Sequence, residues 1–151
     1  MTPDCRESVM RTWQSLLMAR RRLLDAVSAD LKAGGQPPLD VCQVLILLSL
    51  EPGRRLRPVE LERKLELPQY TASRLLDRME KSGLILREPC PGDGRGHHAR
   101  LTETGDEALK SIWPAYHASI ERHLGGNLCD VSAADLANLL DRIGKPAPAT
   151  V

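Results

Sequence analysis

The N-terminal part of the chain carries an apolar stripe with the spacing of one helical face. Thr2 followed by Pro3 is typical of a helix start, and Gly34-Gly35 is typical of a helix end. The sequence therefore predicts one long helix whose stripe packs against another helix. The apolar positions of this stripe are Met10, Trp13, Leu17, Leu24, Val27 and Leu31.

Three shorter helices are predicted in the middle of the chain. Val41–Leu50 is apolar nearly all round, which indicates a buried helix with Asp40 as its N-cap. A second helix begins at Pro58 and runs through Leu65, and a third covers Pro68–Lys81. One face of the third helix is apolar, at Ala72, Leu75, Leu76 and Met79.

Two short strands are predicted next, over Leu84–Glu88 and His98–Thr102. Gly83 closes the preceding helix. The glycine-rich segment between the strands predicts a hairpin with a long tip.

Two further helices complete the pattern. The first is capped by Thr102 and contains Pro114, which predicts a kink. The second follows Ser132 and ends at Gly144. Residues 145–151 are expected to form a flexible tail.

The composition agrees with a helical protein. Of its 151 residues, 42% are hydrophobic but only 3% are aromatic, and Phe is absent, which favours an aliphatic helical core. The longest apolar run is too short to span a bilayer, and the N-terminus lacks the pattern of a secretory signal. We therefore expect a cytoplasmic protein without a membrane partner.

Positive charge is concentrated in the middle of the chain. The net charge is +1 overall, yet residues 53–102 hold 11 Lys and Arg against 7 Asp and Glu, a net +4, and the remainder is −3. The three short helices and the hairpin thus include the basic segment, which favours contacts with phosphates.

The predicted order of elements is the layout of a winged helix-turn-helix between long helices. Specific segments are Leu75-Leu76-Asp77-Arg78-Met79-Glu80, Gly83-Leu84-Ile85, Arg87, Asp93-Gly94-Arg95 and Leu101-Thr102-Glu103-Thr104-Gly105. In content, order and spacing these segments resemble the signature of the MarR family of transcriptional regulators. The resemblance runs over roughly residues 39–124. It departs at Gly94, where the family often has an arginine.

The resemblance implies a mainly α fold with a small antiparallel β-hairpin wing. A winged helix-turn-helix over residues 39–102 would be embedded in an all-helical dimerisation frame, formed by residues 1–35 and 103–144. It further implies a homodimeric regulator, a repressor, that binds a pseudo-palindromic operator in double-stranded DNA. The third short helix would enter the major groove and the wing the minor groove. The implied DNA contacts are Gln69, Tyr70, Thr71, Ser73, Arg74, Arg78, Asp93 and Arg95.

The family also commonly holds a small aromatic or phenolic anion in a cleft lined by the first, second and fifth helices, and such a ligand would relieve DNA binding. Residues that offer stacking surface, charge or hydrogen bonds there are Trp13, Arg20, Trp113, Tyr116 and His117. The two tryptophans fit ordinary core positions equally well.

The cysteines leave a redox-sensing regulator of the same fold as an alternative. Cys5 lies in the first turn of the long helix, where the helix dipole favours a thiolate, and Cys129 lies in a loop. Cys90, His97 and His98 invite a metal hypothesis, but adjacent strand residues point to opposite faces and a fourth ligand is missing. We therefore predict neither a metal site nor a cofactor.

The sequence argues against an enzyme. It contains no G-x-S-x-G, H-E-x-x-H or Walker motif, and the glycine-rich segment is not followed by a helix that would cradle phosphate. A winged helix that binds protein instead of DNA is the remaining alternative, and the basic middle segment disfavours it.

Overall fold

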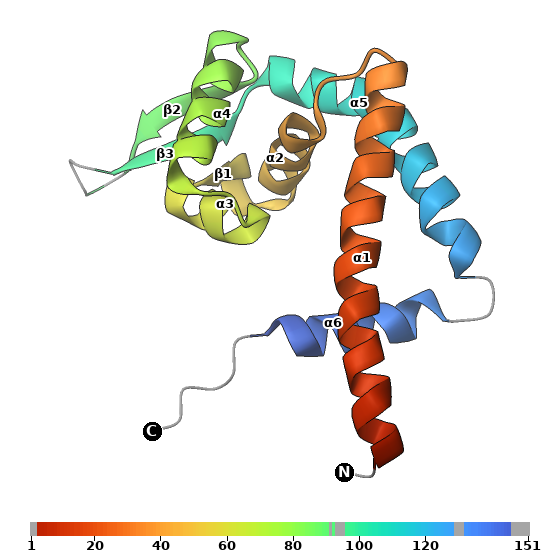
Figure 1. Cartoon of the computed structure of the whole chain (residues 1–151). Coiled ribbons are helices and arrows are strands. Elements are labelled where there is room, and N and C mark those ends of the chain that lie inside the picture. The colour runs from red at the N-terminus through yellow and green to blue at the C-terminus, as the bar shows by residue number, and fades with distance from the viewer. Residues whose placement is uncertain (1–2, 91, 93–95, 129–131, 146–151) are drawn as a thin grey trace.

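The computed structural model describes residues 3–90, 92, 96–128 and 132–145. The fold is mainly α with one small antiparallel sheet, as predicted, and Figure 1 shows the elements in place. In chain order the elements are α1 (Pro3–Ala33), α2 (Leu39–Leu50), the 3-10 turn η1 (Pro52–Arg54), β1 (Arg55–Leu56), α3 (Pro58–Leu65), α4 (Gln69–Lys81), β2 (Ile85–Pro89), β3 (His97–Leu101), α5 (Glu103–His123), η2 (Gly125–Asn127) and α6 (Ala133–Gly144).

The sheet has a strand that the sequence did not predict. Its order is β1-β3-β2, and β1 adds the pairs Arg55↔Arg100 and Leu56↔Ala99 to the hairpin. A strand of two residues is too short to show an alternating pattern. β2 and β3, which we call the wing, are each displaced by one residue from their predicted bounds.

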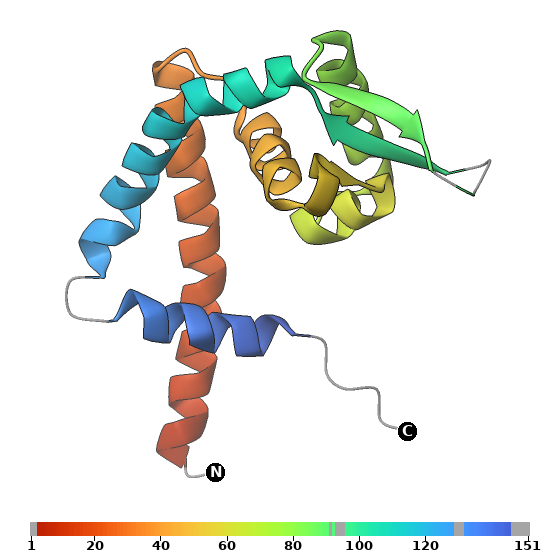
Figure 2. The same ribbon diagram turned by 180° about the vertical axis from the view of Figure 1, so that it is seen from behind.

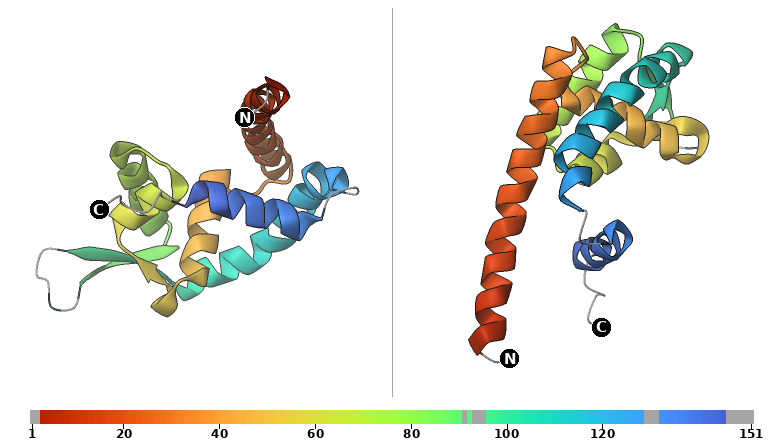
Figure 3. Two further views of the ribbon diagram at one scale, coloured as in Figure 1. Left: turned by 90° about the horizontal axis from the view of Figure 1, so that it is seen from below. Right: turned by 90° about the vertical axis from the view of Figure 1, so that its right-hand side faces the viewer.

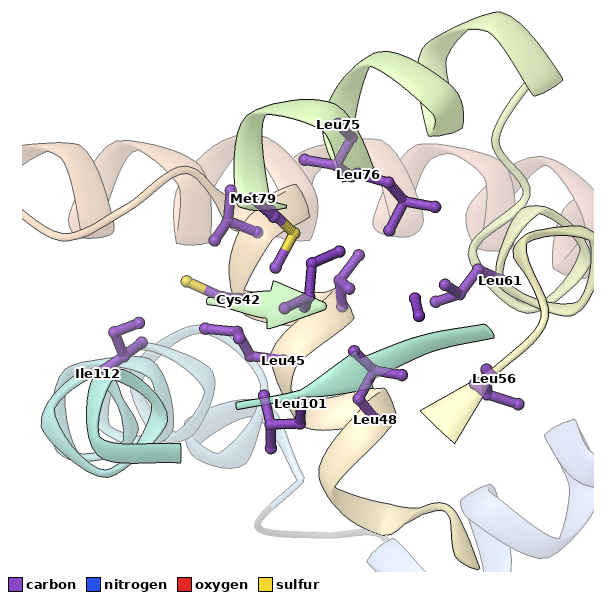
Figure 4. Packing of buried hydrophobic residues seen from close by; sticks show 14 of the residues in the cluster. Cys42, Leu45, Leu48, Leu56, Leu61, Leu75, Leu76, Met79, Leu101 and Ile112 are labelled. Atoms are coloured by element: carbon purple, nitrogen blue, oxygen red, sulfur yellow. The ribbon is translucent and has the colours of Figure 1, made fainter. Parts of the chain in front are cut away.

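The core is built around α2. Figure 4 shows its side chains meeting those of α4, the sheet and α5. Because these elements surround α2, apolar side chains on several sides of the helix find apolar neighbours, which explains its nearly all-apolar sequence. The buried residues of α2 are Val41, Cys42, Val44, Leu45 and Leu48. They pack in one cluster with Leu75, Leu76, Met79, Leu101 and Ile112, among others.

The start of α2 corrects one prediction. Asp40 is not the N-cap, because the helix begins at Leu39 and Pro38 occupies the cap position without a side-chain hydrogen bond. Asp40 Oδ1 instead accepts a hydrogen bond of 2.8 Å from the adjacent Val41 N–H. Pro38 fixes the extended backbone from which the helix starts.

The predicted stripe of α1 divides into two halves. Its C-terminal half packs on the chain itself, with Val27 and Leu31 buried. Its N-terminal half leaves large apolar side chains exposed, and Figure 3 shows this part of α1 extending away from the other elements. α6 likewise has no buried residue among those described. The exposed apolar residues are Val9, Met10, Trp13, Leu17 and Met18 on α1, and Leu139, Leu140 and Ile143 on α6.

α5 connects the sheet to the long helices. Thr102 caps it as predicted, since its Oγ1 accepts a hydrogen bond of 3.0 Å from Gly105 N–H. Gly105 lies so close to Leu84, the residue before β2, that an added Cβ would meet the Leu84 carbonyl oxygen. Pro114 lies inside the helix, and Figure 2 shows the ribbon of α5 changing direction along its length.

Candidate functional site

α4 presents two chemically different faces. Ala72, Leu75, Leu76 and Met79 are buried against the core, as the spacing predicted. The opposite face is polar and exposed. α4 itself lies at the end of the molecule away from the N-terminal half of α1 and from α6 (Figure 1). All the implied DNA contacts that α4 carries are on the exposed side: Gln69, Tyr70, Thr71, Ser73, Arg74 and Arg78.

Arg74 and Tyr70 form a pair on this exposed face. Arg74 Nη1 donates a hydrogen bond of 3.0 Å to Tyr70 Oη, and the guanidinium carbon lies 5.4 Å from the centroid of the tyrosine ring. The two residues are one helical turn apart, so the contact forms within α4. It restricts the guanidinium while leaving its other N–H groups free to donate.

Arg87 on β2 joins the wing to α4, a role that the sequence alone did not suggest. Its Nη2 lies 2.7 Å from Asp77 Oδ1 and 3.5 Å from the Ser73 carbonyl oxygen. Its backbone N–H donates to Glu80 Oε2 at 3.1 Å. These contacts hold the strand against the exposed flank of α4 and so fix the angle between helix and wing.

Two ion pairs link the helix-turn-helix to its surroundings. Arg78 on α4 lies 3.4 Å from Asp40 on α2, and Arg20 on α1 lies 3.2 Å from Glu66 in the turn between α3 and α4. Arg78 therefore has an intramolecular partner as well as an exposed side chain. The remaining implied contacts, Asp93 and Arg95, lie outside the described residues.

The five residues expected to bind a ligand do not line one cavity among those of the described residues. Arg20 lines a cavity of about 530 Å³ between α1, α2 and α3. Trp113 lines a separate, mainly apolar cavity of about 400 Å³ between α2 and α5, together with Ile46, Ser49, Leu50, Leu109, Lys110 and Pro114.

Trp113 also contacts two of the other expected residues. Its ring centroid lies 6.2 Å from that of Tyr116 and 6.1 Å from that of His117. Trp13 is 58% exposed on the N-terminal half of α1. Burial raises the pKa of the half-buried Tyr116 hydroxyl, and Cys42 raises it further, so this hydroxyl stays neutral.

The cysteines occupy different environments. Cys5 is exposed near the start of α1, whereas Cys129 lies outside the described residues. Cys42 is fully buried, and burial raises its pKa to about 11. Cys90 is also buried, and its Sγ lies 3.6 Å from His98 Nε2.

The described residues contain no cluster of three or more His, Cys, Asp or Glu side chains arranged to hold a metal ion. None of the described helices combines the length and the apolarity needed to cross a membrane.

Comparison with known proteins defines the family. Residues 36–96, which span α2 to β2, match the sequence profile of the MarR family. The multiple antibiotic resistance protein MarR of Escherichia coli strain K12 is 30% identical over 108 residues, which cover 70% of this chain and 75% of that protein. The chain belongs to the MarR family.

Two further relatives extend the comparison. The transcriptional repressor MprA of Escherichia coli strain K12 is 32% identical over 111 residues, which are 70% of this chain and 62% of MprA. The chain thus spans less than two thirds of that relative. The crystal structure of the MarR-family regulator Sco3205 from Streptomyces coelicolor, in complex with DNA, superposes with a TM-score of 0.76 and 28% identity, covering 89% of this chain and 84% of that one.

Proposed function

We propose that this MarR-family chain is a homodimeric transcriptional repressor that reads duplex DNA with α4 and the wing. The observation that carries the proposal is the polar, exposed face of α4, which is backed by a buried apolar face and held at a fixed angle to the wing by Arg87. A rigid helix with Gln and Arg on its outer face suits the edges of bases in the major groove, where Gln pairs with adenine and Arg with guanine.

Two comparisons support this assignment. Sco3205, whose fold this chain shares, was crystallised with DNA, and the relative MprA is a transcriptional repressor. The net +4 of residues 53–102 supplies the positive potential that phosphates require.

A homodimer accounts for the exposed apolar residues. Those on the N-terminal half of α1 and on α6 are exposed to water in the single chain, and packing against a second copy would bury them. We propose that residues 1–35 and 103–144 form the dimerisation frame and residues 39–102 the DNA-binding lobe. Two copies of α4 would then face successive major grooves of a pseudo-palindromic operator.

We propose the Trp113 cavity as the site of the effector, a small aromatic or phenolic ligand. The indole offers stacking surface, Ser49 a hydroxyl and Lys110 a positive charge beside a mainly apolar wall. Because this cavity separates α2 of the DNA-binding lobe from α5 of the frame, an occupant shifts one relative to the other. The ligand relieves repression if it binds the DNA-free conformation of the protein more tightly than the DNA-bound one.

Selection from random duplex DNA tests the proposed function. We expect retention of a pseudo-palindrome with half-sites about one helical turn apart, bound at least about 10³-fold more tightly than random duplex. Binding to protein but to no duplex would support the protein-binding alternative instead. If peroxide abolishes operator binding in wild type but not in a Cys5→Ser/Cys129→Ser variant, the result would support the alternative that these cysteines regulate DNA binding by sensing oxidants.

The effector site has its own test. In a Trp13→Phe variant Trp113 is the remaining tryptophan, so its fluorescence reports the cavity directly. 4-Hydroxybenzoate serves as the probe, and we expect saturable quenching together with release of the operator. Quenching that requires Trp13, or release that survives Trp113→Ala, would move the effector elsewhere.

A further inference from the structure

The end of the wing next to its tip holds a thiol and an imidazole side by side. Cys90 follows the last residue of β2, and His98 is the second residue of β3, with Sγ and Nε2 3.6 Å apart. Cys90 is 5% exposed. The buried His98 Nδ1 has no hydrogen-bond partner among the described residues, so the thiol is the polar group that this imidazole meets.

This arrangement has the chemistry of an activated nucleophile. A thiol reacts as the thiolate, and an adjacent imidazole can accept its proton at the moment of attack. The other buried thiol of the described residues has no such base. Cys42 Sγ donates to the Pro37 carbonyl oxygen at 3.5 Å, and burial keeps it protonated.

A backbone hydrogen bond joins Cys90 to the chain that leads into the other strand. The N–H of Cys90 donates to the Gly96 carbonyl oxygen at 2.7 Å, beyond the last paired residues of β2 and β3. Opening the end of a hairpin costs far less than global unfolding. Cys42 lies at the centre of the core, in α2, so its exposure requires the core to open.

We propose that Cys90, with His98 as its base, is a site of covalent modification by small soft electrophiles of the α,β-unsaturated carbonyl class. The thiol proton passes to His98 Nε2, and the sulfur forms a bond to the β-carbon as the carbon–carbon π bond breaks. The imidazolium then returns the proton to the α-carbon. The addition is complete without an oxidant or a reductant.

The adduct has a consequence that rests on the proposed function. A substituent on a buried sulfur cannot be accommodated between the two strand ends without displacing them. The wing then moves relative to α4, and operator binding weakens. An electrophile would thus act on this regulator through the wing, apart from the proposed effector cavity.

The experiment measures labelling of the folded, full-length chain by methyl vinyl ketone, mapped by peptide mass spectrometry over time. We expect Cys90 to be labelled at least about tenfold faster than Cys42. His98→Gln should slow labelling of Cys90 at least about tenfold and leave Cys5 and Cys42 unchanged. His97→Gln is the matched control, because His97 is the exposed neighbour on the same strand and should leave the Cys90 rate as in wild type.

The outcomes are distinct. Labelling of Cys90 no faster than of Cys42, or equal rates in wild type and His98→Gln, overturns the proposal. A thermal melt of His98→Gln shows whether the substitution destabilises the fold. Local unfolding would speed the labelling of Cys90, so slower labelling cannot come from that cause. If Cys90 is labelled as expected but operator binding is unchanged, the proposed weakening of DNA binding by the adduct is wrong. If unlabelled wild type binds no DNA, the proposed function fails while the labelling result stands.

Discussion

Arg20 of α1 and Glu66 of the turn between α3 and α4 form an ion pair with Nη2 and Oε2 3.2 Å apart. The pair joins the long helix of the proposed frame to the helix-turn-helix, and it borders the cavity between α1, α2 and α3. Both side chains are largely exposed, at 63% and 74%. Breaking and re-forming this contact should therefore cost little free energy.

The first prediction concerns the strength of this pair. A double-mutant cycle with Arg20→Ala and Glu66→Ala should give a coupling of less than about 1 kcal/mol in the free energy of unfolding, because water screens exposed pairs. Chemical denaturation at fixed protein concentration measures it, with the exposed neighbour Arg21→Ala as control. A coupling above about 2 kcal/mol would mean that the dimer buries the pair.

The second prediction concerns Gly105. Alanine normally stabilises a helix by about 0.5–1 kcal/mol relative to glycine. Here the added Cβ would collide with the Leu84 carbonyl oxygen and lie 2.7 Å from Leu101 Cδ1. We expect Gly105→Ala to lower the free energy of unfolding by about 1–3 kcal/mol, the usual cost of overpacking.

Gly144, the last residue of α6, is the matched control because an added Cβ would meet nothing within 4 Å. Gly144→Ala should be neutral or slightly stabilising. Equal effects of the two substitutions in thermal or chemical melts would contradict the close approach of α5 to Leu84.

The third prediction concerns Asp30, which joins α1 to α5. Its Oδ2 accepts hydrogen bonds from Ser119 Oγ at 2.7 Å and from His123 Nε2 at 2.9 Å, and it also pairs with Arg122. The hydrogen bonds from Ser119 and His123 hold the pKa of Asp30 below its ordinary value of 3.8. Because the folded state lowers this pKa, the stabilisation is complete above pH 3.8 and is lost as the pH falls through the folded-state pKa.

Denaturation of wild type and Asp30→Asn across this acid range checks the sign. Wild type should exceed the variant in stability at pH 6, and the gap should close as the pH falls. Asp25→Asn, on the exposed side of the same helix, is the control. A gap that widens toward low pH contradicts the assigned interactions.

The fourth prediction concerns assembly. Light scattering at micromolar concentration should give twice the chain mass of 16.7 kDa. Leu17→Glu introduces a charge into the exposed stripe of α1 and should shift the chain toward monomer, because a buried charge without a partner is costly. Leu86→Glu, at an exposed apolar site on β2, is the control and should leave the dimer intact. A monomeric wild type would contradict the proposed dimerisation frame.

Much of the fold could be predicted because prolines and glycines mark where its helices begin and end. Pro58 and the Leu67-Pro68 pair set the limits of α3, and the predicted bounds of that helix are confirmed. β1 was missed because a strand of two residues is too short to show the alternation of apolar and polar positions that predicts a strand. Asp40 was wrongly placed as an N-cap because Pro38 supplies the same boundary by backbone geometry alone.

The candidate site was less accessible to sequence reasoning. The exposed residues of α4 follow from helical periodicity, so their shared face could be predicted. The contacts of Arg87 with Asp77 and Glu80 depend on how the wing packs, which periodicity does not specify. The family resemblance made Arg20 and Trp113 candidates for one cleft, and in the structure they line two cavities. Periodicity does not specify this packing either.

The fifth prediction separates two arginines proposed to contact DNA. Arg74→Ala should weaken operator binding by about 1–3 kcal/mol and relax the preference at one base pair in each half-site. Arg95→Ala should weaken binding to operator and random duplex alike, since the resemblance places this residue in the minor groove. It should lower the slope of log affinity against log salt by about two, one for each subunit of the dimer.

The most direct test of DNA recognition by α4 is therefore a salt titration by fluorescence anisotropy, on the selected operator and on random duplex. Wild type, Arg74→Ala and Arg95→Ala are compared with Arg142→Ala, which removes the same charge from α6. Arg74→Ala should narrow the gap in affinity between operator and random duplex, whereas Arg142→Ala should preserve it. An unchanged gap in affinity in Arg74→Ala would contradict DNA recognition by α4, because its polar face would then not read the bases.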